Sequence, residues 1–206
     1  MVVLEARMRL HATIVASLFL GTVVMLSGCT LIEQIRPSAR IDALGGRVEL
    51  PEAGIAVTFP DDWLRESPPS LAGGGVAAVL EPDQRELLVP LLKVMPPSRH
   101  DWCVVADITP LVEAQAEWQT LDDVVGGLER RLAADPRWVG LDTTILGLPA
   151  GPTGQITRSV AHEASSVTTF IFTQPEAWSM LECFAQTVRP KDWLPRAESF
   201  EFVREE

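Results

Sequence analysis

The spacing of apolar residues predicts one clear helix near the middle of the chain. Between Leu121 and Ala134, apolar residues recur at intervals of three and four, which places them on one helix face. They are Leu121, Val124, Val125, Leu128 and Leu132. Thr120 and Asp123 have the spacing of a capping box at its start, and Asp135-Pro136 ends it.

Strand patterns occupy most of the remaining chain, since runs of β-branched, aromatic and other apolar residues alternate with turn-forming residues. The predicted strands are Arg47–Leu50, Ile55–Phe59, Val76–Leu80, Leu87–Val94, Trp138–Leu148, Gly154–His162, Val167–Thr173, Ala177–Thr187 and Ser199–Val203. Shorter helices are predicted over Pro110–Trp118 and Lys191–Glu198. Short turns in the last third predict antiparallel hairpins. The whole pattern predicts a chain with both helices and antiparallel strands.

The first 28 residues have the pattern of an export signal. Arg7 and Arg9 precede an uncharged run of 15 residues, Ala12–Leu26, which is shorter than the roughly 20 residues that span a bilayer. Glu5 is unusual in such a signal. Translation from Met8 rather than Met1 would remove it, and the sequence leaves both starts open.

The end of this run, Leu26–Cys29, reads Leu-Ser-Gly-Cys and resembles the lipobox of bacterial lipoproteins. The resemblance implies cleavage between Gly28 and Cys29 and a diacylglyceryl group on the Cys29 sulfur. Two or more acyl chains hold a protein at a membrane stably. The expected location is the extracytoplasmic face of a cell membrane, with a Gram-positive or actinobacterial envelope expected first. A plain signal peptide or an uncleaved anchor helix is the alternative.

Breaker residues after Cys29 predict a lipidated tether over residues 29–46, followed by a single domain over residues 47–206. The chain has 206 residues, enough for one domain of ordinary size. Its 17 basic and 28 acidic residues give a net charge of −11, which argues against a nucleic-acid-binding surface. Three Cys and three His are few for a metal site, and no phosphate-binding glycine motif is present, so no cofactor is expected.

Three short segments of the chain are similar to the PsbP/Mog1-like fold, including LpqN-type lipoproteins of actinobacteria. They are Gly54–Pro60 followed by Trp63, the antiparallel run Ser166–Cys183, and Ala197–Phe202. The resemblance implies an α+β fold with a central antiparallel β-sheet flanked by helices. Members of this group serve in photosystem assembly, in binding small GTPases and in extracytoplasmic roles, and they share no catalytic residue that would carry over to this chain.

Two cysteines remain after lipidation, Cys103 and Cys183. An exported protein meets an oxidising environment, which favours a disulfide between them. Two buried free thiols are the alternative.

Candidate binding residues come mainly from the tryptophans. Trp102, Trp118 and Trp193 are the ones we expect to be exposed on a partner surface, because tryptophan is enriched at binding hot spots. A packing role in the core is the alternative.

Catalytic chemistry has weaker support. His100 and His162 each precede an acidic residue, but neighbours in a strand point to opposite faces. A hydrolase would need these histidines to converge with distant carboxylates. The sequence therefore favours a non-catalytic accessory or binding module for a protein or envelope partner, then a carrier of a small hydrophobic ligand, and last a hydrolase.

Overall fold

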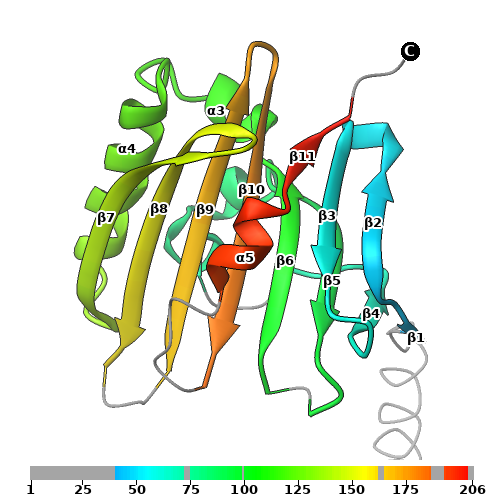
Figure 1. Ribbon diagram of the computed structural model, residues 1–206. Coiled ribbons are helices and arrows are strands. Elements are labelled where there is room, and N and C mark those ends of the chain that lie inside the picture. The colour runs from blue at the N-terminus through cyan, green and yellow to red at the C-terminus, as the bar shows by residue number, and fades with distance from the viewer. Residues whose placement is uncertain (1–39, 72–74, 99, 162–164, 187–192, 204–206) are drawn as a thin grey trace, which may run out of the picture. The chain divides into compact units, whose positions relative to one another are not determined.

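The computed structural model describes residues 40–71, 75–98, 100–161, 165–186 and 193–203 (Figure 1). In chain order the strands and helices are β1 (Arg40–Ala43), β2 (Gly46–Leu50), η1 (Pro51–Ala53), β3 (Ile55–Phe59), β4 (Leu64–Ser67), η2 (Val76–Val79), α2 (Pro82–Arg85), β5 (Val89–Met95), β6 (Trp102–Asp107), α3 (Thr109–Glu113), α4 (Leu121–Ala133), β7 (Trp138–Leu148), β8 (Gly151–Val160), β9 (Ser166–Gln174), β10 (Ala177–Ala185), α5 (Leu194–Glu198) and β11 (Glu201–Phe202).

Within these residues the strands form two antiparallel sheets. The larger has eight strands in the order β1-β4-β5-β6-β10-β9-β8-β7, and the smaller has three in the order β11-β3-β2. Strands β7 to β10 follow one another as a meander, as predicted, and β10 then pairs with β6. The predicted α+β class with antiparallel sheets is confirmed.

Each face of the large sheet is covered by a separate hydrophobic cluster. On one face, α3, α4 and η2 pack over residues such as Val104, Ile156 and Ile171. On the other face, the small sheet and α5 pack over residues such as Leu92, Phe172 and Leu181 (Figure 1). The central strands are therefore apolar on both faces, which explains their nearly continuous hydrophobic runs.

Helix α4 forms where its apolar spacing predicts it. Thr120 accepts a hydrogen bond from the backbone N–H of Asp123, and the Asp123 carboxylate accepts one from the backbone N–H of Thr120, which completes the capping box. Val124, Leu128 and Leu132 on its inner face are almost fully buried.

Three predictions of local structure are wrong. Residues 40–43, assigned to the tether, form β1, which pairs with β4, and β2 begins at Gly46, so the domain begins at Arg40 rather than Arg47. Val76–Leu80 forms the 3-10 helix η2 instead of a strand, because side chains of Glu182 and Arg85 take up its backbone groups. The helix predicted over Pro110–Trp118 ends at Glu113.

Candidate functional site: an interlayer cleft and the buried polar core

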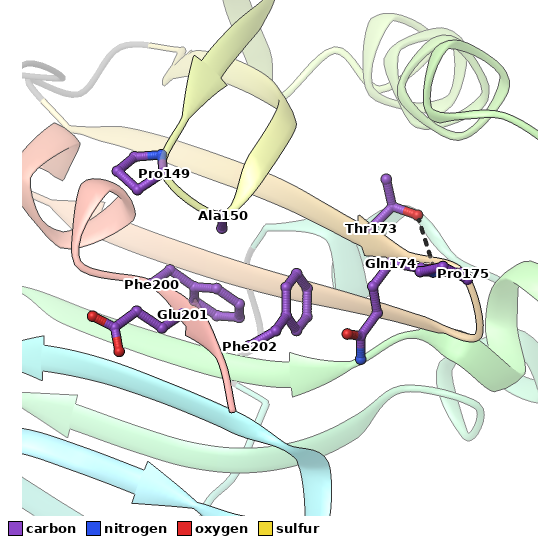
Figure 2. A pocket seen from close by; sticks show the side chains of 8 residues that line it. All are labelled: Pro149, Ala150, Thr173, Gln174, Pro175, Phe200, Glu201 and Phe202. Atoms are coloured by element: carbon purple, nitrogen blue, oxygen red, sulfur yellow. Dashed lines mark hydrogen bonds between the residues drawn. The ribbon is translucent and has the colours of Figure 1, made fainter. Parts of the chain in front are cut away.

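An open cleft of about 530 Å³ lies where three segments distant in the sequence meet. The turn between β7 and β8 contributes Pro149 and Ala150, and the end of β9 with the following turn contributes Thr173, Gln174 and Pro175. Phe200, Glu201 and Phe202, at and before β11, form the remaining side (Figure 2). The cleft therefore separates the edge of the small sheet from the large sheet.

Stacked aromatic rings fix the floor of this cleft. Phe200 stacks on Phe172 with their ring centroids 3.9 Å apart, and Phe202 meets Phe200 edge to face at 5.5 Å. Among the described residues that line the cleft, Glu201 is the one ionisable residue, and its carboxylate pairs with Arg47 across the small sheet. The lining offers polar as well as apolar surface, with the Gln174 amide among its polar groups (Figure 2).

A second polar arrangement lies inside the fold, on the face covered by α4 and η2. Arg158 of β8 donates to Thr169 of β9 and to Oε2 of Glu182 of β10, both over 3.0 Å. The same carboxylate oxygen accepts hydrogen bonds from the Thr169 hydroxyl and from the backbone N–H of Val76. The ring of Trp138 lies 4.7 Å from the Arg158 guanidinium carbon.

Burial governs the electrostatics of this pair. Arg158 is fully buried, and desolvation lowers its pKa, although the charge and hydrogen bond of Glu182 act in the opposite direction. Gly75 has a φ of +70°, and a Cβ there would lie 1.7 Å from Oε1 of Glu182. The network therefore fixes the start of η2 to the sheet, and only glycine fits at position 75.

Cys103 and Cys183 are joined by a disulfide in the centre of the large sheet. They lie opposite each other in β6 and β10, with their Cα atoms 4.1 Å apart, and both are fully buried. The bond links residues 80 positions apart in the sequence. It lies on the face covered by the small sheet.

The three candidate tryptophans do not form one surface. Trp118 is 4% exposed and packs on α4 beside Gly127, with Arg131 over its ring. Trp193 is 6% exposed and meets Trp63 edge to face in the cluster on the opposite side of the large sheet. The expectation that these two are exposed is therefore wrong, because both fill interlayer space.

Trp102 differs from the other two, since it is half-buried. It stacks on Phe184, its cross-strand neighbour, with a centroid distance of 5.6 Å. Its ring is thus held mainly by a pairing within the sheet.

Of the two candidate histidines, His100 lies among the residues that the structure describes. His100 is exposed. The carboxylate of the neighbouring Asp101 accepts a hydrogen bond from the backbone N–H of Gln186. His162 lies outside the described residues. Among the described residues, no three His, Cys, Asp or Glu side chains are placed to hold a metal ion.

The interface between α4 and the large sheet is tightly filled. A Cβ at Gly154 of β8 would lie 2.2 Å from Cγ2 of Val125. A Cβ at Gly127 would lie 2.3 Å from Nε1 of Trp118. At Gly154 the helix and the sheet have no space even for a methyl group, and at Gly127 the same holds between the helix and Trp118, so a ligand cavity is not formed at either position.

Gly28 and Cys29, the predicted cleavage and lipidation residues, lie outside the described residues. Within the described ranges, no helix has the length and hydrophobicity needed to cross a membrane.

The sequence reasoning missed the buried Arg158–Glu182 pair. Arg158 lies in the run Gln-Ile-Thr-Arg-Ser-Val, and Glu182 in Met-Leu-Glu-Cys-Phe. A lone charge within a strand of otherwise uncharged residues was the available signal, because such a charge is rarely buried without a partner.

Comparisons with known proteins give a likeness of fold at low identity. No family model matches the chain, and no curated protein matches it. Among solved structures, it is similar to cyanobacterial PsbP (CyanoP) from Synechocystis sp. PCC 6803, with 11% sequence identity and a TM-score of 0.45. The match covers 82% of this chain and 95% of that chain. A likeness of this degree assigns no function.

Proposed function

We propose that this protein is a lipid-anchored extracytoplasmic lipoprotein whose domain binds a protein or cell-envelope partner without catalysing a reaction. The observation that carries the proposal is the sequence Leu26–Cys29, which follows an uncharged run and ends in a cysteine. Acylation of Cys29 would hold the protein at a membrane surface. Together with the three segments similar to the PsbP/Mog1-like fold, this pattern favours an LpqN-type lipoprotein.

The described domain is compatible with such a location. A disulfide such as Cys103–Cys183 is typical of proteins in oxidising compartments. Ten residues lie between Cys29 and Arg40, where β1 begins. Such a segment spans at most about 40 Å, so an anchored domain would remain close to the bilayer.

Metabolic labelling with an alkyne-tagged fatty acid tests the anchor. The parent protein should incorporate the label and fractionate with membranes, while Cys29→Ser should lose the label. Thr30→Ser is the matched control, because it changes the neighbouring residue and keeps the thiol. Absence of label from the parent, or equal labelling of Cys29→Ser, would contradict the proposal.

The cleft supports a second candidate function, the carriage of a small hydrophobic molecule. Its volume of about 530 Å³ suits a small ligand, and Phe202 is the aromatic lining residue that such a ligand could contact. Solvent extraction of the purified protein, followed by mass spectrometry, tests this. An apolar molecule should accompany the parent and a Val89→Phe control but not Ala150→Phe, which fills the cleft. A parent that carries no such molecule would contradict this function.

A further inference from the structure

Strand β7 forms a long open edge of the large sheet. It contains eleven residues, and within the described part of the chain it pairs only with β8. The other sheet edges are shorter, with four residues in β1, five in β2 and two in β11. An exposed edge strand of this length is a template for pairing with another strand.

Hydrogen bonds at the far end of β8 establish which backbone groups of β7 point outward. The backbone N–H of Ala161 donates a hydrogen bond to the carbonyl of Arg137, just before β7. The backbone N–H of Val160 donates instead to the carbonyl of Ser165, just before β9. Backbone groups alternate along a strand, so Thr157, Gln155 and Thr153 point toward β7.

The register then assigns the residues of β7 itself. Thr157, Gln155 and Thr153 lie opposite Asp142, Thr144 and Leu146, which are therefore bonded to β8. The intervening residues Thr143, Ile145 and Gly147 direct their N–H and C=O groups away from the sheet. Pro152, which has no N–H, lies opposite Gly147 and agrees with this assignment.

The outward residues carry an apolar, uncharged surface. Ile145 is 44% exposed and lies opposite Gly154, on the sheet face covered by α4. From Thr143 to Thr157 the sequence contains no charged residue, although the whole chain has a net charge of −11. The usual protections of an edge strand, lysine and proline, are absent from β7, which has a bulge between Val139 and Asp142 instead.

We propose that two copies of this chain join through β7, antiparallel and centred on Ile145, to form one continuous sheet. In this register Ile145 lies opposite its counterpart, and Thr143 lies opposite Gly147 of the other copy. Each outward residue then meets an outward residue, which gives about six backbone hydrogen bonds. The two exposed Ile145 side chains become cross-strand neighbours and are buried together.

Charge and strand length favour a second copy over a different partner. Two acidic chains repel each other least where they meet through an uncharged stretch, and this edge offers no row of carboxylates to a basic segment. No other open edge in the described chain exceeds five residues, so a second copy would pair through β7 itself. This inference does not depend on lipidation.

Oxidative crosslinking of Ile145→Cys in the full chain tests the register. Directly opposed, hydrogen-bonded residues have Cα atoms about 5.5 Å apart, which is within disulfide range. Cys103 and Cys183 are already joined, and Cys29→Ser in both proteins removes the remaining thiol, so the new thiol should give a covalent dimer on a non-reducing gel. Glu117→Cys, at an exposed turn, is the control and should remain a monomer. Absence of the dimer, equal dimer in the control, or an adduct with a different protein would overturn the proposal.

The mass of the purified protein tests the same surface without oxidation. The parent should sediment as a dimer, and Ile145→Lys should sediment as a monomer because it introduces two like charges at the centre of the interface. Val89→Lys is the matched control, since Val89 is 42% exposed and lies in β5, away from this edge. A monomeric parent, or an Ile145→Lys variant that remains dimeric, would overturn the proposal. Neither result bears on the proposed lipidation of Cys29, which the fatty-acid labelling tests separately.

Discussion

Arg158 donates a hydrogen bond to Glu182 over 3.0 Å in the interior of the large sheet, two strands apart. Their side chains are 0% and 5% exposed. Each charge depends on the other, because a buried charge without a partner is strongly destabilising.

Glu182→Gln should therefore destabilise the fold far more than loss of a surface ion pair. It leaves the Arg158 guanidinium buried without a counter-charge, and we expect a loss of about 3–5 kcal/mol in the free energy of unfolding. Glu201→Gln, in the exposed pair with Arg47, should cost about 1 kcal/mol or less. Urea unfolding at pH 7 measures both, and similar losses in the two variants would show that the buried pair has no special role.

Glu66 should make the stability of the fold depend on pH at the acidic end. Burial opposes ionisation of this carboxyl, but hydrogen bonds from Lys93 and Ser70 outweigh it and lower the pKa of Glu66 below 4.5. The stabilisation is therefore present above the unfolded-state pKa and is lost as the pH falls through the folded-state value. Unfolding curves collected from pH 7 to pH 3 should show a smaller loss for Glu66→Gln than for the parent. Glu49→Gln, at an exposed position, should follow the parent, and a Glu66→Gln curve parallel to the parent's would contradict this assignment.

Two adjacent glycines of α4 should respond to alanine in opposite ways. A Cβ at Gly126 meets only the flexible end of Arg130, at 3.5 Å, so Gly126→Ala should stabilise the protein by about 1 kcal/mol through helix propensity. A Cβ at Gly127 lies 2.3 Å from Trp118, so Gly127→Ala should destabilise it by about 1–3 kcal/mol. Thermal and urea unfolding measure the difference, and two changes of the same sign would contradict the described packing.

The two cysteines of the domain should be unreactive in the denatured but unreduced protein. Because Cys103 and Cys183 are joined, an iodoacetamide label in urea should add nothing at either position until a reductant is present. Replacing both with alanine should lower the free energy of unfolding by about 4 kcal/mol in the chain-entropy model. Labelling before reduction would show that the bond is absent from the isolated protein.

Elements with a strong local pattern could be predicted from the sequence. Helix α4 and the hairpins β7 to β10 form where apolar periodicity and turn residues place them. The run Val76–Val79 was wrongly predicted as part of a strand, because a short apolar run suits either a strand or a helix. The distant Glu182 carboxylate, hydrogen-bonded to the first residue of this run, fixes its conformation.

The candidate site was harder to predict because it depends on which distant segments meet. The cleft joins residues near positions 150, 174 and 202, and no local pattern connects them. Trp118 and Trp193 were predicted to be exposed only because tryptophan is common at binding hot spots. Tertiary packing buries both side chains. The pairing of Arg158 with Glu182 likewise required the strand order β8-β9-β10.

The central claim is that acyl chains on Cys29 hold this domain outside the cell. Intact-protein and peptide mass spectrometry of the mature amino terminus tests it most directly. The account predicts that the chain begins at Cys29 and that this residue carries the mass of a diacylglyceryl group, with or without a third acyl chain. A mature chain that begins elsewhere, or an unmodified Cys29, would contradict it.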